Sequence, residues 1–160
     1  MRKDVVAPEA RIASESDVAA LARLRYEWRV GEGGEPGLDP ASFETALLRW
    51  MQERRLSHVP FLASRGDTPI GMTWLAIVER VPGPGRFVRR SAYIQSTYVV
   101  ADERSAGVGT QLVSLALDHA GQLGLDYVAV HPSDLAFSLY RRLGFEDSGR
   151  VLGLRHAHHR

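Results

Sequence analysis

Residues 98–113 read Tyr98-Val-Val-Ala-Asp-Glu-Arg-Ser-Ala-Gly-Val-Gly-Thr-Gln-Leu-Val113. An apolar, β-branched run leads into a turn, and the turn leads into an amphipathic segment with helical spacing. The turn has the pattern Arg104-x-x-Gly107-x-Gly109. The first amides of a helix have no intrahelical acceptor, and the helix dipole makes this end positive. Because glycines allow close approach of a ligand, the junction predicts a binding site for phosphate oxygens.

A second segment, residues 136–145, reads Ala136-Phe-Ser-Leu-Tyr-Arg-Arg-Leu-Gly-Phe145. It predicts a short helix that carries Tyr140 and ends at Gly144-Phe145. The glycine pattern by itself fits an ordinary strand-to-helix turn as well as a ligand site. The tyrosine segment downstream favours the ligand site.

Together the two segments resemble the GCN5-related N-acetyltransferase (GNAT) superfamily. There, Arg/Gln-x-x-Gly-x-Gly/Ala binds the pyrophosphate of acetyl-coenzyme A, and Tyr-x-x-x-Gly-Phe places a tyrosine beside the thioester sulfur. The resemblance covers residues 98–112 and 133–145, in the usual order. It implies an α/β (α+β) fold with a mixed, mostly antiparallel sheet of six to seven strands and helices on both faces.

The hydrophobic patterns along the chain predict the element order β-α-α-β-β-β-α-β-α-β. Residues 1–9 are expected to be a flexible leader, and residues 10–160 a single acetyltransferase domain. Ser14, Asp17 and Asp39 are helix-start signals, and Pro132-Ser-Asp134 is expected to cap the last helix. The expected strands are residues 10–13, 59–63, 70–78, 91–100, 127–130 and 146–154. The expected helices end near residues 30, 55, 123 and 143.

Composition excludes several classes of function. The chain has 160 residues, a formal net charge of +1 and no cysteine. It therefore has no disulfide, thiolate zinc site or cysteine nucleophile, and near-neutral charge argues against a general nucleic-acid binder. The histidines of the tail, His156, His158 and His159, show no metal-ligand spacing inside a predicted element and are interpreted as a solvated terminus. We therefore expect no metal. No apolar run approaches the roughly eighteen residues of a membrane span, so we also expect a soluble cytoplasmic protein.

The resemblance implies that acetyl-CoA binds as a co-substrate at the central strand and the glycine-containing turn. Arg104 would supply a cation for the pyrophosphate, and the pantetheine arm would pair with the edge of strand 91–100, where it diverges from strand 127–130. Ser133 stands where the family often has an asparagine, and it can bind the arm or cap the helix. The residues expected to bind the coenzyme are Tyr98, Val99, Val100, Arg104, Ser105, Ala106, Gly107, Val108, Gly109, Thr110 and Ser133.

Tyr140 is the expected catalytic residue. The coenzyme leaves as a thiolate, and a tyrosine hydroxyl near the sulfur can give it a proton. The alternative is a tyrosine that only packs in the core.

The attacking amine must lose a proton, and the family often uses a glutamate of the central strand for this. The matching residue here is Gln95, which cannot act as a base. Glu79, His131 or an ordered water are the candidates to replace it. Trp28 and Trp74 are expected beside Gln95 on the acceptor side of the site.

These patterns predict an N-acetyltransferase that moves an acetyl group from acetyl-CoA to a primary amine of a small molecule or peptide. The transfer would be direct, in a ternary complex, since no cysteine can carry the acyl group. The alternative is a non-catalytic acyl-CoA-binding sensor or assembly module. The basic cluster at residues 86–90 suggests a third hypothesis, nucleic-acid binding, although a solvated hairpin end fits it better. Related domains often pair, so a homodimer is a further expectation.

Overall fold

The structure, a computed structural model, describes residues 6–156. A five-stranded sheet has the order β1-β2-β3-β4-β5. The first four strands pair antiparallel, and β5 pairs parallel to β4. The strands are β1 (Pro8–Ile12), β2 (His58–Arg65), β3 (Thr68–Glu79), β4 (Arg90–Val99) and β5 (Val128–Val130).

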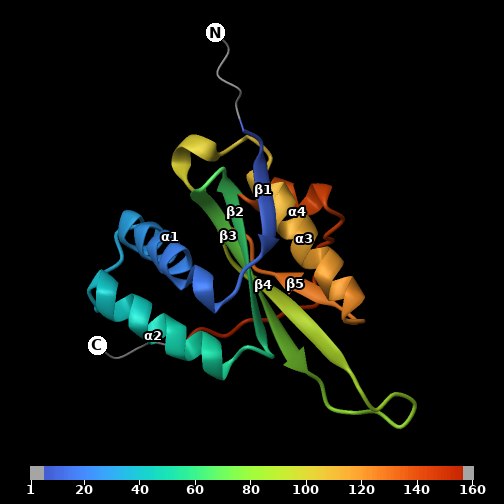
Figure 1. The fold of residues 1–160 in the computed structure, drawn as a ribbon. Coiled ribbons are helices and arrows are strands. Elements are labelled where there is room, and N and C mark those ends of the chain that lie inside the picture. The colour runs from blue at the N-terminus through green and yellow to red at the C-terminus, as the bar shows by residue number, and fades with distance from the viewer. Residues whose placement is uncertain (1–5, 157–160) are drawn as a thin grey trace.

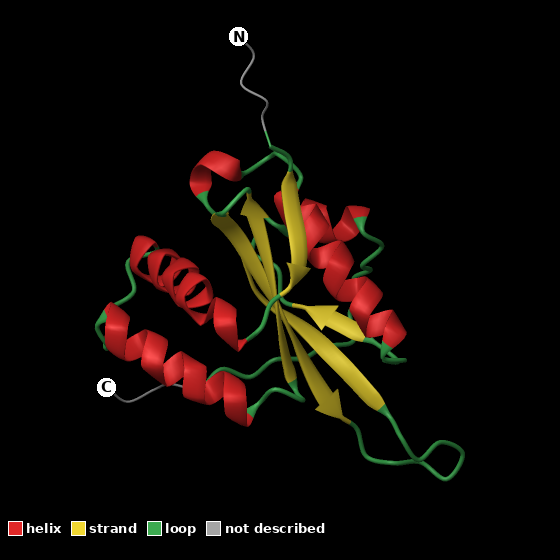
Figure 2. Ribbon diagram, viewed as in Figure 1, coloured by secondary structure: helices red, strands yellow, loops and turns green. Residues whose placement is uncertain are grey.

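Helices cover both faces of the sheet (Figures 1 and 2). One face carries α1 (Val18–Gly31) and α2 (Pro40–Glu53), and the other carries α3 (Val108–Gln122) and α4 (Phe137–Arg142). Short 3-10 turns, η1 (Glu15–Asp17) and η2 (Ala101–Glu103), lead into α1 and the loop before α3. Helices on both faces of a mixed sheet were expected from the sequence, and this part of the prediction is confirmed.

Two helix starts have the caps that the sequence predicts. Asp39 accepts a hydrogen bond from the Ser42 amide at 3.0 Å, and Pro40 occupies the first turn of α2. Ser14 and Asp17 form a capping box around η1. These caps fix where the first two helices leave the sheet.

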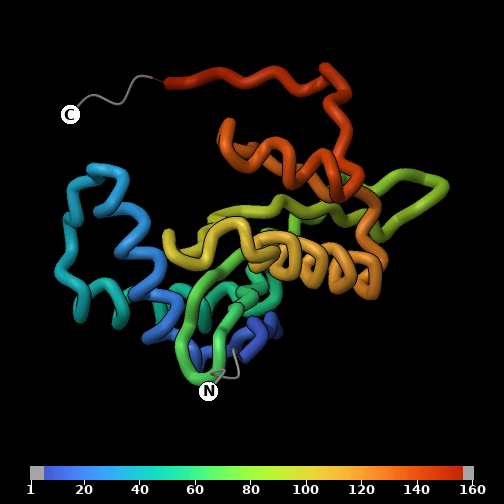
Figure 3. The backbone as a smooth tube through the Cα atoms, turned by 90° about the horizontal axis from the view of Figure 1, so that it is seen from above, coloured from blue at the N-terminus to red at the C-terminus, as the bar shows by residue number. Residues whose placement is uncertain are grey.

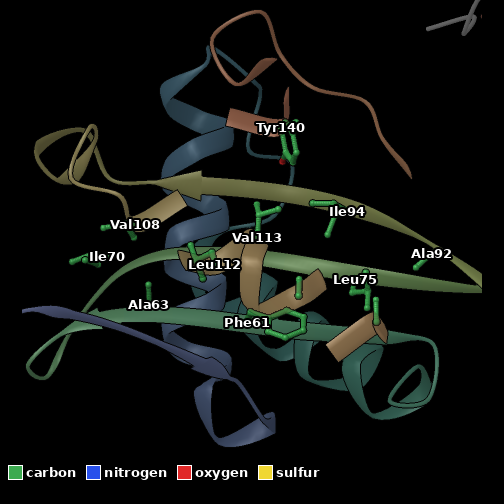
Figure 4. Close-up of a cluster of buried hydrophobic side chains, with 12 residues drawn as sticks. Phe61, Ala63, Ile70, Leu75, Ala92, Ile94, Val108, Leu112, Val113 and Tyr140 are labelled. Atoms are coloured by element: carbon green, nitrogen blue, oxygen red, sulfur yellow. The ribbon is translucent and has the colours of Figure 1, made fainter. Parts of the chain in front are cut away.

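The core consists of two clusters, one on each face, because alternate residues of a strand point to opposite faces. In β3, Leu75 packs towards α3, whereas Met72 and Trp74 pack towards α1 and α2. Figure 4 shows the cluster on the α3 face, where Tyr140 reaches from α4 towards β4. This arrangement brings α4 to the middle of the central strand.

The predicted last strand, residues 146–154, is wrong. The described chain after α4 has no regular secondary structure, and the sheet has five strands, not six to seven. Gly149 has φ 62° and donates to Asp147 Oδ1 at 3.0 Å, which makes a turn inside the predicted strand. Beyond it, Val151, Leu152 and Leu154 are 67%, 96% and 82% exposed. Figures 1 and 3 show this segment running back towards the side where α1 and α2 lie.

Other boundaries also differ from the predictions. β1 begins at Pro8, and Pro8 and Glu9 pair with Arg65 and Ser64, so the strand takes in the end of the expected leader. α4 begins at Phe137 after Ala136, with no side-chain cap. The expected cap at residues 132–134 is therefore wrong. His158 and His159 of the tail lie outside the described residues.

Gly71 lets β3 approach both β4 and α3, and an added Cβ would lie 3.0 Å from Tyr98 O and 3.1 Å from Leu112 Cδ1. We expect Gly71→Ala to lower the free energy of unfolding by about 1–3 kcal/mol, the usual cost of overpacking. Chemical denaturation measures it. Gly85→Ala is the matched control, because an added Cβ there meets nothing within 4 Å. Equal unfolding free energies for the two variants would contradict this account of Gly71.

Candidate active site

A bulge interrupts β4 at its centre. Trp74 pairs with Gln95 and Met72 pairs with Tyr98, so Thr73 faces two residues, Ser96 and Thr97. Ser96 has φ 55°, a left-handed conformation that is uncommon outside glycine. Such two-against-one pairing is a β-bulge, which redirects side chains and often occurs beside active sites.

Three hydroxyl groups meet on the α3 face of this bulge. Tyr140 Oη donates to Thr97 Oγ1 at 3.0 Å, and Thr97 Oγ1 lies 2.7 Å from Thr73 Oγ1. Burial raises the pKa of Tyr140 above its ordinary value, and the hydrogen bond to Thr97 opposes that shift. The hydroxyl is therefore protonated at neutral pH and is able to donate.

Tyr140 also packs in the core. Its side chain is 4% exposed, and its ring meets Phe145 edge to face at 5.4 Å. The core interpretation and the catalytic interpretation of this residue are thus compatible. Packing fixes the ring, and the hydroxyl is left at the bulge.

The pairing between β4 and β5 ends just before the bulge. They pair only between Ala92–Ile94 and Val128–Val130, so in the described chain residues 95–99 have no partner on the β5 side. The Val100 amide donates to Ile70 O on the β3 side at 2.9 Å. The backbone amides of an antiparallel strand point alternately to its two neighbours. The Tyr98 amide therefore points to β3, and the Val99 amide points to the open edge. Of these three predicted contacts, Val99 alone has its amide directed to the gap.

The loop before α3 exposes consecutive amides. Ser105 has φ 63° and Gly107 has φ 82°. Within residues 6–156 no acceptor is found for the amides of residues 105–110, and the first paired amide is that of Gln111, which donates to Gly107 O. Successive amides in such a turn at a helix start form a concavity that binds anions.

The two glycines of this loop have different reasons to be glycine. Gly107 needs its positive φ, and an added Cβ would meet nothing within 4 Å. At Gly109 an added Cβ would lie 3.0 Å from Leu139 Cδ1, so this glycine lets α3 pass close to α4. The sequence analysis expected these glycines to allow close approach of a ligand, and it did not predict the contact with α4.

A stack of aromatic rings and guanidinium groups joins this loop to the bulge. Arg104 Cζ lies 5.7 Å from the Tyr98 ring centroid, and Arg104 Nε donates to Val99 O at 2.9 Å. Trp28 stacks on Tyr98 at 5.7 Å, and Arg25 Cζ lies 5.1 Å from the Trp28 ring centroid. Arg25 Nη1 donates to Ser96 Oγ at 2.9 Å. Trp28 thus lies between the loop and the bulge.

A groove of about 390 Å³ lies between α1, α2 and the strands β2–β4. Gln95 and Ser96 of the bulge line one end of it, and Trp74, Trp50, Phe43 and His58 are among its walls. The predicted acceptor-side residues Trp74 and Gln95 are thereby brought together.

His58 is a groove residue that the sequence analysis missed. Its Nδ1 lies 2.8 Å from Ser57 Oγ, and its ring meets Trp50 at 4.7 Å. Burial, and to a lesser degree the charge of Arg54, lowers the pKa of His58, so the ring is neutral at neutral pH. The sequence did hold a signal for His58, namely its spacing from Leu62. The two residues are four positions apart in β2, so their side chains point to the same face of the sheet, and Leu62 belongs to the cluster under α1 and α2.

Three predicted residues are not among those that line the groove. Glu79 is exposed and pairs in register with Arg90. At a rise of about 3.4 Å per residue, Glu79 lies about 20 Å along β3 from Thr73. His131 is exposed and stacks on Tyr93 at 6.3 Å. Ser133 is exposed, and its carbonyl accepts from the Ala136 amide.

In the described chain no group of three or more His, Asp or Glu side chains is placed to hold a metal ion. No helix there is both long enough and apolar enough to cross a membrane.

Comparison with known families gives a match over residues 20–145 to the model of the acetyltransferase (GNAT) family. No curated protein matches the chain in sequence.

Solved structures match nearly the whole fold. A predicted acetyltransferase from Clostridium acetobutylicum, solved with acetyl-CoA, is 22% identical with a TM-score of 0.76, over 95% of this chain and 100% of that one. Glucosamine-6-phosphate N-acetyltransferase from Arabidopsis thaliana is 14% identical with a TM-score of 0.71, over 93% and 98%. An aminoglycoside acetyltransferase from an uncultured soil metagenomic sample, in complex with trehalose, is 15% identical with a TM-score of 0.77, over 95% and 97%. At these identities the likeness concerns the fold.

Proposed function

Because the chain belongs to the acetyltransferase (GNAT) family, we propose that it transfers an acetyl group from acetyl-CoA to a primary amine. The observation that carries this proposal is the juxtaposition at β4. The loop with unpaired amides, the open strand edge and the Tyr140 hydroxyl all lie along one strand, and an acceptor groove opens at its bulge.

The residues of the loop fit the diphosphate of the coenzyme. The amides of residues 105–110 are free to donate, and Arg104 adds a cation at the same helix start. The Val99 amide at the open edge can pair with the pantetheine arm as a neighbouring strand would. When bound, the coenzyme supplies an acetyl thioester, which is activated towards amines.

Tyr140 is proposed to hold the proton that the departing sulfur requires. Its raised pKa keeps the hydroxyl protonated, and its bond to Thr97 keeps the hydroxyl at the bulge. Thr73 supports Thr97 from β3 and so contributes to positioning.

The proton of the attacking amine needs a different acceptor. Gln95 lines the groove but cannot take a proton. Among the described residues that line the groove, Arg25 and His58 are the titratable ones, and the neutral ring of His58 can accept a proton directly or through water. We therefore propose His58 in place of Glu79 or His131 as the proton acceptor.

Two measurements test the function. Calorimetry with acetyl-CoA is expected to detect binding, and a free-thiol assay is expected to detect coenzyme A release that depends on an added amine. The glucosamine-phosphate and aminoglycoside enzymes named above act on amino sugars, so amino sugars belong in the panel beside amino acids and simple amines. Binding without release by any amine would favour the non-catalytic module. Absence of binding would refute both functions.

A further inference from the structure

Arg25 is a partly buried cation without an acidic partner. It projects from α1 into the groove, and its hydrogen bond in the described chain is the one from Nη1 to Ser96 Oγ. No carboxylate lies within 4 Å of it there, whereas Arg65 pairs with Glu103 at 2.7 Å and Arg11 with Asp17 at 2.7 Å. A guanidinium has five N–H donors, so Arg25 retains several for a ligand.

The groove has the wrong charge for a polycationic acceptor. Its described lining contains no aspartate or glutamate, and its walls are largely aromatic and aliphatic, with Trp50, Trp74 and Phe43 among them. A cation that enters would meet Arg25 and gain no counter-charge. An acceptor with one anionic group and an apolar body would instead satisfy both Arg25 and the walls.

The bulge brings the Arg25 contact and the Tyr140 contact to consecutive residues of β4. Arg25 is bonded to Ser96, and the next residue, Thr97, receives the Tyr140 hydroxyl. Ser96 lines the groove and Thr97 bonds Thr73 and Tyr140, so the two contacts flank one peptide unit, and an acceptor that carries its amine close to its anion fits this arrangement best. An α-amino acid carries both groups on one carbon, and a guanidinium binds a carboxylate through two parallel hydrogen bonds.

We propose that the acceptor is a free α-amino acid with an apolar or aromatic side chain, and that Arg25 is its carboxylate anchor. The side chain lies along Trp50 and Trp74, and the α-amine faces the bulge. This inference rests on the proposed function and adds the class of acceptor to it. The volume of about 390 Å³ is within the range of small-molecule sites.

The reaction balances without a further reagent. A bond forms between the amine nitrogen and the acetyl carbon as the carbon–sulfur bond breaks. The amine gives up one proton to His58 or water, and the sulfur gains one from Tyr140, which is reprotonated by solvent. The products are an N-acetyl amino acid and the free thiol of coenzyme A.

Three ligands distinguish the carboxylate contact with Arg25 from the ring contact with Trp50 and Trp74. They are phenylalanine, 2-phenylethylamine, which lacks the carboxylate, and alanine, which lacks the ring. Trp50 and Trp74 line the groove and Trp28 touches Arg25, so tryptophan fluorescence reports binding directly. Titrations with and without saturating coenzyme A are expected to show phenylalanine bound about 10- to 100-fold more tightly than 2-phenylethylamine, the usual effect of a charged hydrogen-bonded pair. Alanine is expected to bind more weakly than phenylalanine, because it leaves the aromatic walls uncovered.

The variant Arg25→Gln is expected to reduce phenylalanine binding, and kcat/KM for its acetylation, by about 10- to 100-fold, and to reduce the binding of 2-phenylethylamine clearly less. Arg23→Gln is the matched control, since Arg23 lies on the same helix but pairs with Glu27 and Pro69 O outside the groove. The inference is overturned if wild-type protein binds phenylalanine no more tightly than 2-phenylethylamine, both with and without saturating coenzyme A. That comparison needs no variant and no acetyl transfer. Thiol release with other amines but not with amino acids would overturn the inference and leave the proposed function standing.

Discussion

Tyr140→Phe is expected to lower kcat for acetyl transfer by on the order of 10²- to 10⁴-fold, the usual contribution of a positioned general acid. The affinity for acetyl-CoA should change little. The substitution removes one hydroxyl and keeps the ring, so the edge-to-face contact with Phe145 persists. Steady-state kinetics measures kcat, and calorimetry measures the affinity.

The pKa of Tyr140 adds a pH signature to this prediction. Burial raises that pKa above the ordinary tyrosine value, so the protonated, donating form persists through neutral pH and is lost only as the pH rises past the raised pKa. A loss of activity assigned to Tyr140 should therefore lie on the alkaline side, above about pH 10. In Tyr140→Phe that limb should disappear from the residual activity.

Tyr127→Phe is the control for loss of a tyrosine hydroxyl, because Tyr127 is 53% exposed. Thr97→Val provides a second variant, since it leaves Tyr140 intact but removes its hydrogen-bond acceptor. We expect Thr97→Val to lower kcat less than Tyr140→Phe does. If Tyr140→Phe turns over several amines at the wild-type rate, Tyr140 is a core residue only, and the proton comes from elsewhere.

Local sequence signals predicted the parts of the fold that local chemistry determines. The caps at Ser14 and Asp39, the helix after Gly107 and the strand before it follow from residue type and spacing over a few positions. The strand at residues 146–154 failed because a strand needs a partner. Val151, Leu152 and Leu154 supply apolar residues, but strand pairing is a long-range property. The turn at Gly149 and the exposure of these three side chains keep the segment out of the sheet.

The site was predictable to the same extent. The motifs indicated Tyr140 and the loop amides as candidate site residues. No pattern in the sequence predicted that the Tyr140 hydroxyl would meet Thr97, because a bulge opposite Thr73 depends on strand register. Arg25 was visible on the first helix, yet the absence of an acidic partner is a property of the packed groove. Glu79 was a reasonable base by residue type, and distance along β3 removes it.

Arg104→Glu is expected to weaken acetyl-CoA binding by about 100-fold, since it replaces a charged hydrogen-bonding partner of the diphosphate by a repelling carboxylate. Arg104 is exposed and held over Tyr98, so the substitution leaves the core intact and keeps the loop dihedrals. Calorimetry measures the change, and the wild-type affinity should fall with added salt because the contact is electrostatic.

Arg89→Glu changes net charge by the same amount on the hairpin between β3 and β4, far from the loop in Figure 1, and serves as its control. A general charge effect would weaken acetyl-CoA binding equally in both variants, whereas loss of a diphosphate contact would weaken acetyl-CoA binding in Arg104→Glu alone. The amides of residues 105–110 remain in both proteins. Residual binding by Arg104→Glu therefore reports what the backbone contributes without the side chain. Unchanged affinity in Arg104→Glu would mean that the coenzyme does not lie at the start of α3, and the proposed function would lose the observation that carries it.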